Sequence, residues 1–521
     1  MADQRNSILC VLLVVLLTLG GCQTTVSHSA GAVPLFELQP TPARDALKAS
    51  ATGRLATLLE DPATEQVTFI QVNAQMLVGK PKSLSVSLPD GKAVQFDQRS
   101  AGQIFENIEG WVGARPNPWK TESASAAEVA DDPLYYLSVA SSGDKISADL
   151  AIEGQPYRIE PLDGTQHALV KIDEDKLLPD GEPLRRPDDE GPQSAAIQAP
   201  SAEQSVIRVL LVTTNQLRQK YPDHRLKLAG ALQNANQYMV NSDVAITYQL
   251  AGFFDADYDE RPGMGSMLSD MWEDESALGA SIRVRRDAVL ADLVNMTVTT
   301  SGTEGYCGLG QTNASKTNAF SVIYCYASLA HELGHNMGAS HNNEGEYATY
   351  YYGYRREAEP RFRTRMSYSC LNVSCPQIPY WSNPRLEYQG TPMGTVAYND
   401  VARRFNERRA VVENFYPSMP TTVTLFQEEN LQGRSCSMQL MAPFDDKSCQ
   451  TEVRSAQVHG VDVNATLCFS GHNLRGACYI FERFSGDFDL SNIDEPADLP
   501  AGIRKVINRT QGEVLSIKYF K

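Results

Sequence analysis

Short stretches in which apolar and polar residues alternate fill the chain between about residues 46 and 178, for example at residues 83–88 and 148–152. Turn-forming sequences such as Pro89-Asp90-Gly91 separate these stretches. Successive side chains of a strand point to opposite faces of a sheet, so the alternation predicts a β-rich domain over residues 46–178.

A different pattern begins at residue 206. Residues 206–212 are mostly apolar, which is typical of a strand buried on both faces of a sheet. The pattern also predicts a strand over residues 244–254 and helices over about residues 215–239, 287–294 and 399–415. Strands that alternate with helices indicate an α/β domain, which we place at residues 206–416 because two prolines follow at once.

The segment between these regions, residues 179–205, is rich in proline, acidic and small residues, and we predict that it is a linker. Arg185 and Arg186 within it are either a proteolytic processing site or two solvated charges. Their sequence alone favours neither reading.

The last region, residues 421–521, contains an internal repeat of about 43 residues. Phe426 and Gly433 are seven residues apart, as are Phe469 and Gly476, and an Asn-Leu pair recurs between them. Two four-stranded units that pack as an all-β sandwich would explain this repeat.

The first 21 residues predict a signal peptide. A 12-residue apolar run at residues 8–19 is too short to span a membrane, and it ends in Gly20-Gly21-Cys22. This ending resembles a bacterial lipoprotein cleavage site, which implies a membrane anchor through lipidated Cys22, with residues 22–45 as a tether. An ordinary secretory signal is the alternative. We therefore expect either a lipid-anchored protein of the bacterial cell envelope or a secreted protein. Gln rather than Asp at residue 23 resembles the pattern that many bacteria send to the outer membrane, so the outer membrane is the expected site of the anchor.

The composition of the chain limits the class of partner and indicates disulfide bonds. The 521 residues are enough for several domains, and their net charge of −17 argues against nucleic acid as the main partner. An exported chain can form disulfides, and we expect near-neighbour pairing within two clusters, although four cysteines allow three connectivities. The clusters are Cys307, Cys325, Cys370 and Cys375, and then Cys436, Cys449, Cys468 and Cys478.

The sequence HELGHNMGASH at residues 331–341 carries the chemistry. Residues four apart share one face of a helix, so His331 and His335 can bind one zinc ion at ~2.0–2.1 Å. Gly338 can adopt a positive φ, end the helix and bring His341 round as a third ligand. Three protein ligands leave one position for water, which is typical of catalytic zinc, and Glu332 is placed to act as general base.

This motif, followed by a methionine-containing turn at residues 364–368, resembles the metzincin zinc endopeptidases. The resemblance implies a mixed twisted sheet with a zinc-binding helix, and Met366 as an apolar floor beneath the metal. Tyr368 matches a position where some metzincins have a tyrosine near the metal. It would either donate a hydrogen bond to the oxyanion of the reaction or only brace the turn.

Further features resemble the reprolysin-like branch and the bacterial peptidyl-Asp metallopeptidases. They are Cys307-Gly308-Leu309-Gly310, Tyr352-Gly353-Tyr354 and Tyr380-Trp381-Ser382-Asn383-Pro384. The resemblance covers about residues 206–416 and implies that residues 46–178 are a pro-region. Asn342 stands where reprolysins commonly have aspartate, and Arg365 where this turn is usually apolar. Both departures leave zinc binding intact but weaken any cleavage preference carried over from the family.

The C-terminal repeat resembles βγ-crystallin-type Greek-key domains. Residues 452–456 and 501–505 are poor versions of the calcium loop of that family, so we expect weak or no Ca²⁺ binding. Such a domain would bind protein or glycan and target the enzyme, or would inhibit its own peptidase.

The sequence thus predicts a zinc-dependent endopeptidase that hydrolyses extracellular proteins and peptides, with the substrate paired along the strand after Cys307. The alternative is a surface-anchored binding lipoprotein with a non-catalytic zinc domain, and the intact ligands and Glu332 favour the peptidase. The pro-region has no cysteine, so a thiolate cannot cap the metal. An acidic or backbone group could do so, or the region stays as an extra domain.

Overall fold

The structure is a computed structural model. It describes residues 31–74, 77, 79–162, 164–184, 204–273, 275–342, 349–416, 422–439, 454–471, 474–490, 503–507 and 518–519. The predicted signal peptide, Cys22 and the Arg185-Arg186 pair lie outside the described residues. No helix in the described part of the chain is long and apolar enough to cross a membrane.

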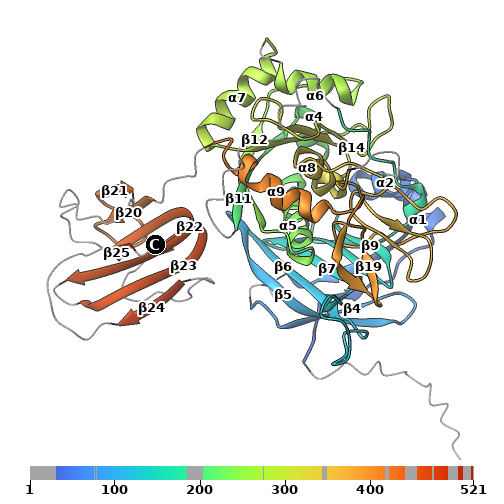
Figure 1. The fold of residues 1–521 in the computed structure, drawn as a ribbon, viewed down its shortest axis with the longest axis horizontal. Helices are drawn as coiled ribbons and strands as arrows, with labels where there is room; N and C mark the ends of the chain where they lie inside the picture. The colour runs from blue at the N-terminus through green and yellow to red at the C-terminus, as the bar shows by residue number, and fades with distance from the viewer. Residues whose placement is uncertain are drawn as a thin grey trace, which may run out of the picture.

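The N-terminal region forms one ten-stranded sheet, drawn in blue to teal in Figure 1. In sheet order its strands are β1 (Val33–Pro34), β4 (Ser83–Ser87), β5 (Ala93–Phe105), β6 (Ile108–Pro116), β7 (Asp131–Ser142), β8 (Lys145–Ile152), β9 (Gln155–Pro161), β10 (His167–Ile172), β3 (Thr64–Val72) and β2 (Phe36–Leu38). Neighbours are antiparallel except for β1 and β4. The prediction of a β-rich region is confirmed.

Two helices cover one end of this sheet. Helices α1 (Arg44–Ser50) and α2 (Gly53–Glu60) pack Leu47, Leu58 and Leu59 against the side chains of β3 and β10. The predicted tether is wrong for its second half, because β1 and β2 precede α1 and bury Leu35 and Phe36 in the core of the sheet. Apolar burial therefore begins about a dozen residues earlier than the sequence pattern suggested.

The second region is built on a five-stranded mixed sheet. Its strands, in sheet order, are β12 (Ile246–Asp255), β11 (Ser205–Thr213), β13 (Leu293–Thr297), β15 (Phe320–Ile323) and β14 (Gly308–Gly310). The first four are parallel, and β14 runs antiparallel to β15 at the edge. The predicted strands over residues 206–212 and 244–254 correspond to β11 and β12.

Helices cover both faces of the mixed sheet, and side chains of α5, α8 and α9 share a core on one face while α6 and α7 share a core on the other. The helices are α4 (Asn215–Lys220), α5 (His224–Asn241), α6 (Met264–Trp272), α7 (Ala277–Val289), α8 (Leu329–Asn336) and α9 (Val401–Glu413), with short 3₁₀ turns η1 (Glu174–Lys176) and η3 (Tyr326–Ser328). The predicted helix over residues 215–239 is interrupted near Pro222. The one over residues 287–294 is wrong: Leu290 ends α7 with a φ of 51°, and the fully buried β13 follows.

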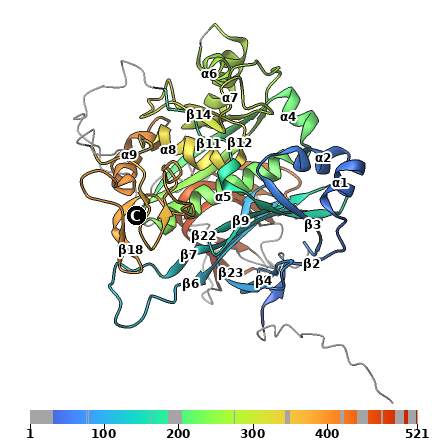
Figure 2. The same cartoon turned by 90° about the vertical axis from the view of Figure 1, so that its right-hand side faces the viewer.

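Helix α5 also lies against the ten-stranded sheet (Figure 2) and joins the two regions. The Tyr136 hydroxyl on β7 donates a hydrogen bond to Asn234 Oδ1 at 2.7 Å, and Asn234 Nδ2 donates to Asp149 on β8 at 2.9 Å. Lys227 of α5 donates to both carboxylate oxygens of Glu160 on β9 at 2.9 Å. The β-rich region is therefore docked on the α/β region rather than tethered beside it.

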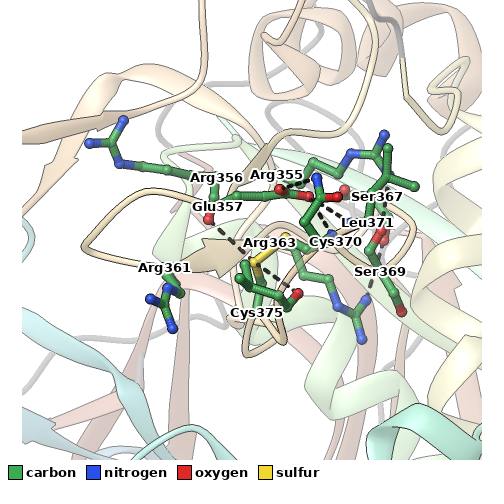
Figure 3. The surroundings of a disulfide bond; sticks show 12 residues. Arg355, Arg356, Glu357, Arg361, Arg363, Ser367, Ser369, Cys370, Leu371 and Cys375 are labelled. Carbon is green, nitrogen blue, oxygen red and sulfur yellow. Dashed lines mark hydrogen bonds between the residues drawn. A yellow bond between two sulfur atoms is a disulfide. The ribbon is translucent and has the colours of Figure 1, made fainter.

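The described residues between α8 and α9 form two small hairpins and a disulfide loop. The hairpins are β16 (Arg355–Arg356) with β17 (Phe362–Arg363), and β18 (Asn383–Tyr388) with β19 (Thr391–Met393). Disulfides join Cys370 to Cys375 (Figure 3) and Cys307 to Cys325, so near-neighbour pairing is confirmed for the first cluster.

The described C-terminal strands form one antiparallel sheet in the order β21 (Ser435–Gln439), β20 (Thr422–Phe426), β22 (Ser455–Gly471), β23 (Leu474–Leu490) and β24 (Ile503–Ile507), with β25 (Lys518–Tyr519) on β22. These strands do not divide into two four-stranded units, so the Greek-key sandwich stays a prediction. Residues 440–453 and 491–502 lie outside the described part.

Candidate metal centre

The first two histidines of the motif lie on α8. His331 and His335 are one helical turn apart and both are buried. Buried side chains of the same helix anchor it to the core of the α/β region, among them Leu329 and Leu333. The two imidazoles are therefore held on one face of a rigid element, as the spacing predicts.

The third histidine arrives through the turn predicted at Gly338. Gly338 has a φ of 93°, and its amide donates to the His335 carbonyl at 2.8 Å. A Cβ atom at this position would lie 2.7 Å from Nε of the flexible Arg404 side chain, and the positive φ is strained for any other residue, so the backbone conformation requires glycine. The turn directs His341 back towards the helix.

The Nε2 atoms of the three histidines converge. His341 Nε2 lies 2.9 Å from His331 Nε2 and 3.0 Å from His335 Nε2. Four-coordinate zinc with ~2.0–2.1 Å bonds places its ligand nitrogens about 3.3–3.4 Å apart, which is close to these separations. Among the described residues, the three histidines are a group able to hold one metal ion.

The contacts of the three Nδ1 atoms favour a cation at the point where the Nε2 atoms converge. His331 Nδ1 donates to the Arg365 carbonyl and His335 Nδ1 to the Ala339 carbonyl, both at 2.9 Å, and His341 Nδ1 faces a Glu182 carboxylate oxygen at 3.3 Å. These acceptors hold the proton on Nδ1 and leave a lone pair on each Nε2. Burial lowers the pKa of His331 to about 4, so its ring is neutral, as a metal ligand must be. Three converging nitrogen lone pairs fit Zn²⁺.

Glu332 stands beside these ligands with its carboxylate enclosed. It has no exposed surface, and neither carboxylate oxygen has a hydrogen-bond partner in the described part of the chain. A Cβ atom on Gly308 would collide with the carboxylate, and one on Gly310 would lie 2.8 Å from Oε2. The two glycines of β14 thus make room for the carboxylate. Burial raises the pKa of Glu332 well above its usual range, and nearby Asp180 raises it further.

The methionine turn lies beneath the helix as expected. The Ser367 amide donates to the Thr364 carbonyl at 3.0 Å, and Met366 is fully buried. A Cβ on Gly334 of α8 would lie 2.8 Å from Met366 Sδ, so the sulfur touches the helix between the two histidines. Met366 is therefore an apolar floor for the site.

The two departures from the family pattern have structural explanations. Asn342 Oδ1 accepts from the Tyr368 amide at 2.9 Å, which ties the segment after His341 to the methionine turn. The Arg365 side chain extends away from the metal site, to Gln377 Oε1 at 2.6 Å and the Ala327 carbonyl at 3.1 Å. Only the backbone carbonyl of Arg365 supports the site.

Tyr368 lies next to the third histidine. Its ring centroid is 4.1 Å from that of His341, and its hydroxyl donates to Glu182 Oε1 at 2.6 Å. Burial and the neighbouring carboxylate raise its pKa, so the hydroxyl keeps its proton. The structure thus brings together all five candidate residues: His331, His335, His341, Glu332 and Tyr368.

Sequence reasoning missed residues 179–184, which were assigned to a linker. Their backbone is paired to edge strand β14, and Asp180 and Glu182 lie against the histidines. The alternation of acidic residues with Gly181 between two prolines was the available signal, but acidic, proline-rich segments are usually solvated linkers.

Three histidines converging on a cation site, with an enclosed carboxylate on the same helix, define a zinc metallopeptidase centre. Residues 227–342 match the sequence model of metallo-peptidase family M12B, reprolysin-like. Peptidyl-Asp metalloendopeptidases from two strains of Stenotrophomonas maltophilia are 31% and 29% identical over 409 residues, and the one from Xanthomonas campestris is 30% identical over 407. These alignments cover 75% of this chain and 95–96% of the relatives. The chain belongs to the peptidyl-Asp metalloendopeptidase family and is a zinc metalloendopeptidase.

Proposed function

We propose that the chain hydrolyses peptide bonds with Glu332 as the general base. The observation that carries this proposal is the enclosed Glu332 carboxylate, which has no hydrogen-bond partner among the described residues and stands next to three converging imidazole nitrogens. Zinc held there supplies Lewis-acid chemistry, which acidifies water and polarises a carbonyl group.

Residues of the chain transfer the proton, stabilise the oxyanion and hold the substrate. Glu332 takes the proton of the attacking water and then delivers it to the leaving amine. The Tyr368 hydroxyl, freed from Glu182, donates a hydrogen bond to the developing oxyanion. Edge strand β14 pairs with the extended main chain of the substrate, which holds the scissile bond over the histidines.

The substrates we propose are proteins and peptides that contain aspartate at the cleaved bond. The relatives are named peptidyl-Asp metalloendopeptidases, and this chain aligns with nearly their whole length. The N-terminal sequence supports an extracellular site of action, with a membrane anchor at lipidated Cys22 in the bacterial envelope. The C-terminal region would bind protein or glycan and bring the enzyme to its substrates.

Mapping of cleavage products tests this proposal. The chain from residue 23 is purified as wild type and as Glu332→Gln. Each protein is incubated with casein, both before and after the protein itself has been treated with limited trypsin. New termini of the casein fragments are identified by mass spectrometry. Wild type should yield fragments cut beside aspartate, and Glu332→Gln should yield none. Glu65→Gln, which changes an exposed carboxylate on β3, is the matched control and should behave as wild type. Equal cleavage by Glu332→Gln would refute the assignment of the base.

A further inference from the structure

Helix α9 lies alongside α8, the helix that carries the first two histidines, in both views of the fold (Figure 1, Figure 2), and the two helices share one core. We propose that Arg404 and Arg408 of α9, here called the arginine clamp, are positioning residues that hold the C-terminal end of α8. Through that end they set the geometry of the candidate metal ligands His335 and His341. The inference concerns metal binding alone and does not depend on the proposed general base.

The last carbonyl groups of α8 are capped from outside the helix. Asn313 N donates to the His335 carbonyl at 2.9 Å, and Ala314 N donates to the Asn336 carbonyl at 3.0 Å. The last carbonyls of a helix have no partners within the helix, so residues 313–314, here called the capping loop, satisfy two of them. Asn313 has a φ of 52°, a left-handed conformation that asparagine tolerates better than most residues. The position of the capping loop therefore fixes the end of α8.

The arginine clamp holds the capping loop in place. Arg404 Nη2 donates to Asn313 Oδ1 at 2.8 Å, and Arg408 Nη2 donates to the Ala314 carbonyl at 2.6 Å. The two arginines are four positions apart, so they lie on the same face of α9. Two positive charges near the C-terminal end of α8 also interact favourably with the helix dipole. The contacts thus run from α9 through the capping loop to the end of the helix that carries two histidines.

Arg404 also packs against the turn that delivers the third histidine. Its Nε is buried and would lie 2.7 Å from a Cβ atom on Gly338, and its guanidinium carbon is 5.5 Å from the Tyr351 ring centroid. Tyr351 is in turn bonded to that segment, because the Ser340 amide donates to the Tyr351 carbonyl at 2.9 Å. An arginine side chain is flexible by itself, but the hydrogen bond to the capping loop and these contacts hold this one at several points.

The expected effect of losing the clamp is a weaker metal site. Arg404→Met keeps an unbranched stem and removes the guanidinium group, so the three histidines remain while the capping loop and the turn lose a common support. Groups that orient metal ligands without binding the metal typically contribute 10- to 100-fold to metal affinity. We therefore expect Arg404→Met to raise the zinc Kd about 10- to 100-fold.

Competition for zinc against a chelator measures this Kd in the chain from residue 23 and needs no catalysis. Arg404→Lys, which keeps the charge but not the planar fork of donors, should recover part of the affinity that Arg404→Met loses. Arg403→Met is the matched control, because Arg403 is the neighbouring arginine of α9, is 46% exposed and pairs with Glu407 at 2.8 Å. Its zinc Kd should stay within about twofold of wild type, since exposed ion pairs contribute little.

Cobalt in place of zinc reports the geometry of the site rather than the stability of the fold. At saturating Co²⁺ the visible absorption spectrum of Arg404→Met should differ from that of wild type, and the spectrum of Arg403→Met should not. A purely structural role of Arg404 would lower the urea midpoint of the metal-free protein and leave both the zinc Kd and the cobalt spectrum unchanged. That result would overturn the proposal, as would wild type that binds no zinc.

Asn313→Gly tests the clamp from the capping loop, so the proposal stays open to refutation even if Arg404→Met does not fold. Glycine accepts the positive φ of this position but removes the oxygen that receives Arg404. Asn313→Gly should therefore raise the zinc Kd and alter the cobalt spectrum, and wild-type values of both would overturn the proposal. Arg408→Met should raise the zinc Kd as well, and an unchanged Kd would overturn the assignment of Arg408.

Discussion

Glu160 on β9 is the carboxylate that joins the β-rich region to the α/β region. It is 3% exposed, and it accepts hydrogen bonds from Arg54 of α2 at 2.8 Å and from Lys227 of α5 at 2.9 Å. Burial disfavours its ionised form, but Arg54 and Lys227 outweigh that effect and hold the pKa of Glu160 below its usual range. Glu160→Gln keeps the shape of the side chain and removes its charge.

The expected cost follows from what the substitution leaves behind. The side chains of Arg54 and Lys227 are only 20% and 12% exposed, so they would stay buried without a counter-charge. Breaking a buried ion pair by removing one partner costs about 3–5 kcal/mol, and we expect the lower end because glutamine still accepts one hydrogen bond. A loss of about 3 kcal/mol corresponds to a factor of roughly 100 in the docking equilibrium.

Urea unfolding of the uncleaved chain from residue 23 measures this cost, with Glu153→Gln as the control because Glu153 pairs with Lys92 at the surface. A carboxylate whose pKa is lowered by folding stabilises the fold above its unfolded pKa of about 4.3, and this stabilisation is lost as the pH falls below that value. The difference between wild type and Glu160→Gln should thus be full at pH 7 and shrink in acid. A difference under about 0.5 kcal/mol at pH 7 would refute the reasoning.

Three further predictions concern the metal centre. Gly310→Ala should lower kcat at least about 100-fold after trypsin treatment, with zinc retained, because the new methyl group displaces the Glu332 carboxylate. Gly265→Ala is the control, because a methyl group has space there and kcat should not change. Similar kcat values for the two variants would contradict the prediction. Asn342→Ala should destabilise the fold to urea by about 1–2 kcal/mol because the Tyr368 amide loses its acceptor, whereas Asn342→Asp should not. Removing metal with 1,10-phenanthroline should lower Tm, and zinc added at 100 times Kd should restore Tm and stabilise the fold by about 2.7 kcal/mol. An unchanged Tm would contradict metal binding at the three histidines.

The metal ligands could be predicted because their geometry is local. A helix fixes His331 against His335, and one glycine turn fixes His341, so eleven residues define the site without knowledge of the rest of the fold. The floor at Met366 followed from family resemblance alone. Its contact with Gly334 depends on residues more than thirty positions away and appears only in the structure.

The pairing of residues 179–184 with the edge of the sheet could not be predicted for the same physical reason. Its hydrogen bonds join residues 179–184 to residues 307–312, and nothing in either segment shows that they are adjacent. Predicted helix boundaries were wrong where the backbone conformation overrode the hydrophobic periodicity, as at Leu290. The early strands β1 and β2 were not predicted because runs of two or three residues carry no periodic signal.

The most direct test of the central claim is the hydrolysis rate of one defined aspartate-containing peptide at known zinc occupancy. Trypsin-treated wild type and Glu332→Gln are brought to equal zinc content by dialysis, and their single-turnover rates are compared at pH 7. The account predicts about one zinc per chain in both proteins and a rate at least ~10²–10⁴-fold lower for Glu332→Gln. Comparable rates, or wild type that hydrolyses the peptide with no zinc bound, would contradict it.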